Sequence, residues 1–397
     1  MKTVVIVHHT CDWGGGTKSL LDLCEMLRDT YKVVVCIPHG NPEFSKKIVD
    51  FGCSAYEFSD PVPFVNIYSG SPPLISVISF RSLRSLTNIK RTGEEILSLN
   101  PDVVIFNSLV TAVTARFLSK KTKVICIDRE TLTSDISIIL YHKLLEGCLD
   151  AITFLSDYEK RKFHFSKPVS YVFPDCVHLE KLSDIDKKTA RQREGVPEDK
   201  YTVLYMGGSA KIKGPDIILE AFNKLDNRFL LLFVGKVNEE KFSKNQLLHD
   251  SKYPGILRFK KRFIKYYYTL KGTPKLLETG LRDAVDDLII ASDLVVFPST
   301  SVHQPRPCIE AGAYGKPVII SDYKETREYF KNGYNALTFK PGDADDLAGK
   351  IRYSYDHKAE MKQIGENNRS MTEKNHDFNE GKRLLCSLIE KVCSNAD

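Results

Sequence analysis

The sequence lacks long apolar runs and closely paired cysteines. No segment approaches the 18 consecutive apolar residues that a membrane-spanning helix needs. The opening stretch MKTVVIVHHT has only a short apolar run and no small-residue cleavage site, so it does not read as a signal peptide. The ten cysteines are scattered without a CxxC pair, and several lie in apolar stretches such as VVVCIP. We therefore expect a cytoplasmic protein with reduced thiols, either free in solution or peripheral at the inner face of the membrane.

Charge of one sign is not strongly in excess. The 397 residues carry 57 Lys and Arg against 51 Asp and Glu, a net charge of +6. Such a balance favours anionic partners, such as a nucleotide, a phosphorylated lipid or an acidic membrane surface, without implying nucleic acid. The length suggests two domains, and 42% hydrophobic residues are enough for a large core in each.

Short apolar strands alternate with amphipathic helices, which predicts an α/β protein with parallel sheets covered on both faces. This pattern begins twice, at TVVIVHHTCDWGGGTKSLLDLCEML and at YTVLYMGGSAKIKGPDIILEAF. We predict two Rossmann-like, doubly wound domains over 1–190 and 191–375, joined by a charged connection near 174–200. Residues 376–397 are expected to form a C-terminal helix, which can pack back on the first domain.

A basic and aromatic segment interrupts this rhythm. Residues 256–272, ILRFKKRFIKYYYTLKG, contain six cations and five aromatic residues. The simpler interpretation is an amphipathic helix with a solvated basic face. Contact with an anionic membrane is the alternative, because aromatic rings enter the interface while Lys and Arg meet the headgroups. Single-stranded nucleic acid could stack on the same aromatic rings, but nothing else in the sequence supports nucleic-acid binding.

Glycine-rich turns follow the first strand of each half. Gly14, Gly15 and Gly16 precede a helix and allow close approach of a ligand, but they form neither a GxGxxG fingerprint nor a P-loop. In the second half, MGGSAKIKGPD carries Lys213 before Gly214 and Pro215. A lysine at a helix start can neutralise a phosphate, although surface lysines are also common there.

The stretch SVHQPRPCIEAGAYGKPVIIS places a cation and an acid at a predicted helix start. Pro307 suits the first turn, Arg306 lies just outside it, and Glu310 lies within it. Glu310 has two interpretations: its carboxylate is only stabilised by the positive end of the helix dipole, or it accepts hydrogen bonds from ribose hydroxyls. Arg306 can clamp a diphosphate with its guanidinium group.

The second half resembles the retaining glycosyltransferases of family 4, which have the GT-B fold and belong to glycosyltransferase group 1. The resemblance rests on MGGSAKIKGPDIILEAF, SDLVVFPSTSVHQPRPCIEAGAYGKPVIISD and ETREYFKNGYNALTFKPGDADDLAGKI, while GGGTKSLLDL supports it loosely in the first half. It implies two Rossmann-like domains facing a central cleft, a nucleotide-diphosphate sugar as donor, and neither a metal nor a cofactor. It makes Lys213, Arg306 and Glu310 the catalytic candidates. It also implies a nucleotide-sugar site formed by Gly14, Gly15, Gly16, Gly207, Gly208, Lys213, Arg306, Pro307, Cys308 and Glu310.

Two positions depart from the family pattern. Val302 stands where the family usually has a Glu thought to contact the donor sugar, and Gly208 replaces the family's phosphate-binding Arg. Arg306 would restore one cation near the diphosphate. His303 lies in the same loop, where a sugar contact and a solvated side chain are both open.

Acceptor recognition is expected in the first half. Asn107 follows one predicted strand, and Arg129 and Glu130 follow the next, so topology directs them to the ligand edge of the sheet. Arg129 and Glu130 can alternatively pair with each other or cap a helix. His8 and His9 are adjacent on a strand, point to opposite faces and cannot jointly chelate a metal.

These features predict a retaining glycosyltransferase that moves a sugar, with a UDP-sugar favoured, to a glycan or lipid-linked acceptor in surface polysaccharide or glycoconjugate synthesis. A non-catalytic nucleotide- or glycan-binding subunit of GT-B type is the main alternative, favoured by Val302. A sugar-nucleotide epimerase on the same architecture is the other.

Overall fold

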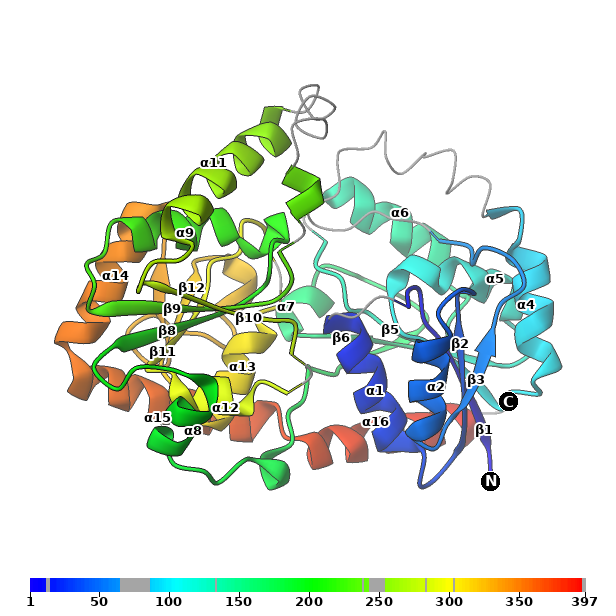
Figure 1. Cartoon of the computed structure of the whole chain (residues 1–397). Coiled ribbons are helices and arrows are strands. Elements are labelled where there is room, and N and C mark those ends of the chain that lie inside the picture. Colours follow the sequence, from blue (N-terminus) through cyan, green and yellow to red (C-terminus); the bar gives the residue numbers. More distant parts are fainter. Residues whose placement is uncertain are drawn as a thin grey trace. The chain divides into compact units, whose positions relative to one another are not determined.

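The computed structural model describes residues 1–11, 15–64, 86–132, 134–237, 239–242, 254–282, 284–302 and 304–394 (Figure 1). The chain divides into two compact units, one formed by Met1–Cys176 with His376–Asp397 and the other by Val177–Asn375. The second unit begins at Val177, which is before the predicted domain boundary at residue 190. The reason is that part of the predicted connection is the helix α8 (Lys187–Glu194), which packs against α12 (Asp286–Ala291) of the second unit.

The first unit is built on a parallel sheet of seven strands in the order β3-β2-β1-β4-β5-β6-β7. Its strands are β1 (Thr3–Val7), β2 (Lys32–Ile37), β3 (Ser54–Glu57), β4 (Val103–Phe106), β5 (Lys123–Ile127), β6 (Ala151–Phe154) and β7 (Val169–Val172). Its helices are α1 (Gly15–Leu27), α2 (Pro42–Asp50), α4 (Ile89–Ser98), α5 (Ala115–Leu118), α6 (Asp135–Leu145), α7 (Asp157–Lys160) and α16 (Phe378–Ser394), with the 3₁₀ helix η2 (Leu109–Thr114). Helix α16 packs against α1, so the C-terminal helix belongs to the first unit.

Both faces of this sheet are covered, which explains the continuous apolar runs of its strands. Along β1, Val4 and Ile6 join a core cluster with Leu20 of α1 and Leu388 of α16. The alternate residues Val5 and Val7 join a separate cluster on the other face. Alternation of side chains along a strand therefore divides one apolar run between two helical layers.

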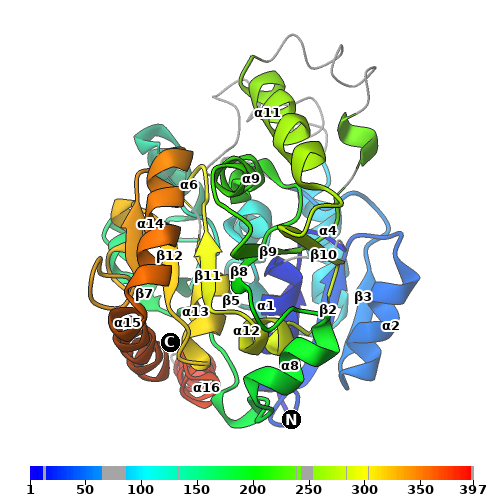
Figure 2. The same ribbon diagram turned by 60° about the vertical axis from the view of Figure 1, so that its left-hand side comes forward.

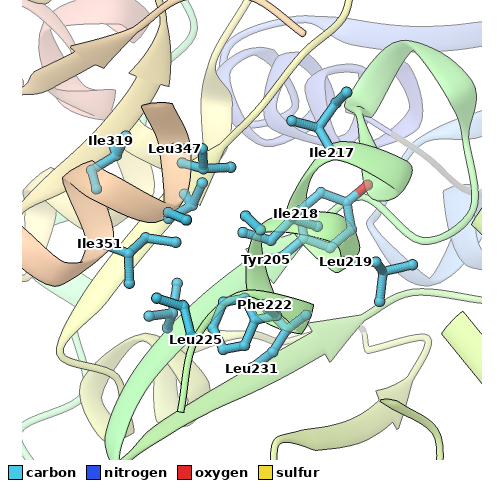
Figure 3. Packing of buried hydrophobic residues seen from close by; sticks show 14 of the residues in the cluster. Tyr205, Ile217, Ile218, Leu219, Phe222, Leu225, Leu231, Ile319, Leu347 and Ile351 are labelled. Carbon is cyan, nitrogen blue, oxygen red and sulfur yellow. The ribbon is translucent and has the colours of Figure 1, made fainter. Parts of the chain in front are cut away.

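The second unit repeats the design with six parallel strands in the order β10-β9-β8-β11-β12-β13. The strands are β8 (Tyr201–Met206), β9 (Phe229–Val234), β10 (Leu276–Gly280), β11 (Leu294–Phe297), β12 (Val318–Ser321) and β13 (Leu337–Phe339). The helices besides α8 and α12 are α9 (Pro215–Asn223), α11 (Pro254–Leu270), α13 (Arg306–Ala313), α14 (Ala344–Asp356) and α15 (Lys358–Asn375). Figure 3 shows one face of its core, where Phe222 of α9 and Ile351 of α14 pack with Leu231 of the sheet.

The α/β class and the two doubly wound sheets are as the sequence predicted. The strands that the sequence pattern missed are β3 and β10, each at the edge of its sheet. Edge strands are half exposed, so their sequences SAYE and LLETG carry no buried apolar run.

The basic segment folds as the amphipathic helix α11, which runs alongside α9 (Figures 1 and 2). Phe259, Phe263 and Tyr267, spaced four residues apart, are buried in the core of the second unit. Tyr266 is partly buried against the same cluster, so four of the five aromatic side chains of the segment stabilise the fold. None of the helices in the described part of the chain combines the length and the apolar character needed to cross a bilayer.

Candidate functional site

The strand order of the second unit defines where its ligand site is expected. From β8 the chain continues to β9 on one side, whereas β11 lies on the other side of β8 and leads on to β12. Ligands of open α/β sheets bind at such a switch point, outside the carboxyl ends of the strands. The loop from Gly207 to Gly214 follows β8, and the loop from Pro298 to Pro305 follows β11. The predicted donor-site residues of this unit lie in these two loops and the first turns of the helices that follow them.

Backbone geometry explains the glycines after β8. The N–H groups of Gly207 and Gly208 both donate to the carbonyl of Val234, at 3.2 and 2.9 Å. Gly208 has a positive φ of 53°, and a Cβ there would lie 3.0 Å from the carbonyl oxygen of Lys236. A larger residue, such as the Arg of the family pattern, would be strained in this conformation. These two N–H groups are engaged within the unit.

Lys213 is held by a turn that is fastened to the next loop. It ends the 3₁₀ helix η4 (Lys211–Lys213), and Thr300 donates its N–H to the carbonyl of Ile212 at 3.0 Å. The Nζ atom of Lys213 lies 5.0 Å from the ring centroid of Phe297, the last residue of β11. Gly214 has a φ of 68°, and a Cβ would lie 1.8 Å from the carbonyl oxygen of Pro298. Only glycine allows the two loops to approach so closely.

Arg306 and Glu310 form an ion pair within one helix. The prediction that Arg306 lies just outside this helix was wrong. Helix α13 begins at Arg306, with Pro305 as its N-cap, so Arg306 is the first helical residue and Glu310 lies one turn later. The Nε atom of Arg306 donates to Oε1 of Glu310 at 3.1 Å, and the two side chains are only 10% and 12% exposed. A cation and an acid thus form one (i, i+4) pair at the start of the helix.

The other candidates in this unit differ in what they offer. Cys308 is fully buried in the core behind α13, and burial followed by the nearby Glu310 raises the pKa of its thiol. Its side chain packs in the core of the unit. Val302 is half-buried in the loop after β11, while His303 lies outside the described residues, as does Gly14 of the first unit.

In the first unit, four strands deliver polar residues to one connected network. His8 follows β1, Asn107 follows β4, Arg129 lies just beyond β5, and Asp175 lies beyond β7. Arg129 donates from Nη1 to Asp175 Oδ1 at 2.8 Å and from Nε to Asn107 Oδ1 at 3.2 Å. The Nδ2 atom of Asn107 is 3.3 Å from His8 Nδ1. The sheet places its switch point between β1 and β4, so this network lies at the ligand edge of the unit.

Glu130 has a separate, capping role. Its Oε2 atom accepts the N–H of Leu109 at 3.0 Å and the N–H of Arg129 at 3.2 Å, and its Oε1 accepts the hydroxyl of Ser108. These bonds fix the start of η2, as the helix-cap alternative anticipated. The Arg129 guanidinium pairs with Asp175 and not with Glu130.

Sequence reasoning missed His8 and Asp175 as members of this network. Asp175 belongs to the stretch FPDC, which the pattern assigned to an interdomain connection. His8 was considered only as a metal ligand, although its place directly after the first strand is a usable signal. Among the described residues, no group of three or more His, Cys, Asp or Glu side chains is arranged to hold a metal ion.

Comparison with known proteins identifies the family that the second unit resembles. Residues 259–371 match the family model for glycosyl transferases group 1, a segment that includes Arg306 and Glu310 but not Lys213. The chain is similar to the group 1 glycosyltransferases. A D-inositol 3-phosphate glycosyltransferase of Geodermatophilus obscurus is 26% identical over 46% of this chain and 39% of its own length. The putative teichuronic acid biosynthesis glycosyltransferase TuaC of Bacillus subtilis is 29% identical over 47% and 42%. The chain thus spans less than half the length of these curated relatives.

Solved structures establish the fold over nearly the whole chain. Anabaena HepE in complex with UDP and glucose superposes with a TM-score of 0.75 at 18% identity, covering 98% of this chain and all of that one. Sucrose-phosphate synthase of Thermosynechococcus elongatus gives a TM-score of 0.75 at 15% identity, with both chains fully covered. At this level of identity the likeness shows the fold alone, which is the predicted GT-B fold.

Proposed function

We propose that this chain is a retaining glycosyltransferase that transfers a sugar from a nucleotide-diphosphate sugar, with a UDP-sugar favoured, to a glycan or lipid-linked acceptor. One observation carries the proposal. The switch point of the second unit has Lys213 on one loop and the Arg306–Glu310 pair at the helix start after the neighbouring loop, and the pair lies inside the segment that matches group 1. The UDP and glucose in HepE support a UDP-sugar donor, and TuaC supports a role in surface polysaccharide synthesis.

Each residue has a role that its chemistry suits. Lys213 would neutralise the diphosphate as a point charge. Glu310 would accept hydrogen bonds from the ribose hydroxyls, because an ionised carboxylate accepts several donors at once. Arg306 holds Glu310 through Nε, and we propose that it orients this carboxylate and adds positive charge at the same helix start.

In the proposed reaction, the negative charge on the leaving diphosphate is what the protein must stabilise. Positive, oxocarbenium-like charge develops on the sugar while negative charge builds on the departing diphosphate. Fixed positive groups stabilise that change without reorganising, which is the role we assign to Lys213 and the N-terminal turn of α13. The leaving phosphate would take the proton of the acceptor, so the scheme requires no protein base, metal or cofactor.

A non-catalytic nucleotide- or glycan-binding subunit is the second candidate, because Val302 occupies the place of the usual sugar-contacting Glu. A thermal-shift screen with UDP, GDP, ADP and their sugars tests binding, since a ligand that prefers the folded state raises the melting temperature. Release of nucleoside diphosphate on adding glycan or lipid-linked acceptors then tests turnover. The proposed enzyme gives both signals, a binding subunit gives the first alone, and an epimerase converts the donor with no acceptor present.

Substitution of Lys213 gives the sharper test. Lys213→Ala should lose the donor-induced rise in melting temperature and the release of diphosphate. Lys211→Ala is the matched control, because Lys211 opens the same turn and is exposed. Equal losses in both variants would contradict a specific role for Lys213. The anomeric configuration of the first-formed product, measured by NMR, tests retention.

We also propose that α11 contacts an anionic membrane surface. Arg258, Lys261 and Lys265 are exposed and spaced three and four residues apart, so they share a face of the helix, and Tyr268 continues it with 54% exposure. Such a basic stripe is attracted to anionic headgroups. The attraction would hold the protein near a lipid-linked acceptor.

A further inference from the structure

Two cysteines of the first unit form a pair of thiols away from the ligand edge of the sheet. Cys24 lies in α1, and Cys53 lies directly before the edge strand β3. Both belong to the core cluster that α1 shares with the sheet. A side-chain hydrogen bond joins the two thiols, and each of the cysteines is free, with no disulfide. The fold thus brings two thiols from distant parts of the sequence into direct contact.

An arginine of the same helix holds the turn that carries Cys53. Arg28 follows Cys24 by four residues, so the two side chains share a face of α1. Its Nη1 atom donates to the carbonyl of Phe51 at 2.8 Å, and its guanidinium carbon lies 5.9 Å from the centroid of the Phe51 ring. A Cβ placed on Gly52 would lie 3.9 Å from Cδ of Arg28. Contacts with Arg28 therefore position the turn beside Cys24.

The two thiols differ in access and in acidity. Cys24 has no exposed surface, whereas Cys53 is 6% exposed and lies between the exposed residues Gly52 and Ser54. The hydrogen bond with Cys24 lowers the pKa of the Cys53 thiol; burial opposes this effect and the positive charge of Arg28 adds to it. The same hydrogen bond, followed by burial, raises the pKa of Cys24. Because the thiolate is the reactive form, Cys53 is the nucleophile of the pair.

We propose that Cys24 and Cys53 are an oxidation-sensitive dithiol, which a peroxide converts to a disulfide between α1 and the turn before β3. The thiolate sulfur of Cys53 attacks one oxygen of hydrogen peroxide, the O–O bond breaks, and Cys53 becomes a sulfenic acid. The departing hydroxide takes up the proton that the Cys53 thiol released and becomes water. The sulfur of Cys24 then attacks that of Cys53, the S–O bond breaks, and the hydroxyl group leaves as a second water with the Cys24 proton. The two thiols lose two electrons and the peroxide gains them. This modification site goes beyond the proposed glycosyltransferase function and does not depend on it.

Peptide mass spectrometry of the full-length protein tests the pair. The folded protein is treated with a few equivalents of hydrogen peroxide, the remaining thiols are alkylated in denaturant, and the protein is digested without reduction. The peptides of Cys24 and Cys53 should be recovered joined by a disulfide, and dithiothreitol should separate them. Cys386 is the internal control, because it is more exposed than Cys53 while burial raises the pKa of its thiol. Cys53 should react about tenfold faster or more, since a thiol pKa lower by one gives about ten times more thiolate. The absence of the joined peptide, a disulfide from Cys53 to another cysteine, or faster oxidation of Cys386 would overturn the proposal.

Cys24→Ser and Cys53→Ser separate the two steps. A serine at position 24 cannot displace the hydroxyl group of a sulfenic acid, so oxidation of Cys24→Ser should stop at Cys53, where dimedone traps the sulfenic acid. In Cys53→Ser, Cys24 should give neither a disulfide nor a dimedone adduct. Dimedone present during oxidation of the unchanged protein should label Cys53 in the same way, so the assignment does not depend on the folding of a variant. An adduct on Cys24 and not on Cys53 would refute the roles of the two thiols.

Discussion

Replacing Arg306 with alanine removes one partner of the pair at the start of α13 and leaves Glu310 as a largely buried carboxylate. The pair is 10% and 12% exposed, so little water is available to solvate the remaining charge. Removing one partner of a buried ion pair costs about 3–5 kcal/mol, and the residual exposure places this variant at the lower end, about 3 kcal/mol.

The chain supplies a matched control. Arg369 and Glu373 of α15 form an (i, i+4) pair of the same residue types at 2.7 Å, but their side chains are 52% and 46% exposed. An exposed helical pair contributes about 0.3–0.5 kcal/mol, so Arg369→Ala should have a small effect. The two pairs share spacing and residue types and differ strongly in burial.

Hydrogen exchange of α13 and α15, followed by mass spectrometry, measures both variants locally. Arg306→Ala should speed the exchange of α13 amides by about 100-fold or more, since each 1.4 kcal/mol is a factor of ten. Arg369→Ala should change α15 about twofold. Similar effects in the two variants would refute the inference that the Arg306–Glu310 pair is buried and interdependent. Unchanged donor KM in Arg306→Ala would separately remove its role in the donor site.

Three further predictions concern the backbone, a buried acid and the basic helix. Gly214→Ala should lower the free energy of unfolding more than Gly195→Ala. Gly195 has nearly the same φ, 67°, but a Cβ there would meet nothing within 4 Å. Equal decreases would show that the loop contact is unimportant. Burial raises the pKa of Asp216 from 3.8 to about 6, so the folded state holds a proton that the unfolded state releases between about pH 4 and 6, and stability from this group falls as pH rises. Asp216→Asn should therefore stabilise the second unit at pH 7 by up to about 3 kcal/mol and by little at pH 4, and a difference that does not depend on pH would contradict this. Lys261→Glu should lower co-sedimentation with anionic liposomes at low salt, whereas Lys362→Glu on α15 should not.

The sequence predicted every interior strand of the two sheets but only one edge strand of each, β7 from VSYVF and β13 from NALTF. Central strands such as TVVIV and DLVVFP are buried on both faces, so their composition alone reveals them. The edge strands β3 and β10 were missed because SAYE and LLETG are half solvated and carry no β-branched residues apart from one Thr, whereas the equally exposed β7 is recognisable by its two valines. The interdomain boundary was also displaced, because the charged helix α8 carries little apolar signal although it packs in the second unit.

For the candidate site, local sequence indicated which residues to examine but not how they interact. The Lys213 turn and the start of α13 could be placed from proline, glycine and strand patterns. That Arg306 pairs with Glu310 depends on where α13 begins, and a shift of one residue in that start changes which residues the helix cap and first turn include. Glu130 was an acceptor candidate by position, yet its bonds to the backbone of η2 give it a capping role.

The sequence by itself determined the α/β class, the two repeated halves and the loops in which chemistry is expected, because these follow from hydrophobic periodicity and turn residues that act over short distances. Only the tertiary structure decided that residues separated by up to 167 positions, from His8 to Asp175, form one hydrogen-bonded network. Parallel strands bring such distant residues to one edge of a sheet, and the direction of each hydrogen bond there depends on which side chains meet. That information resides in the pairing of strands, which no local pattern of residues contains.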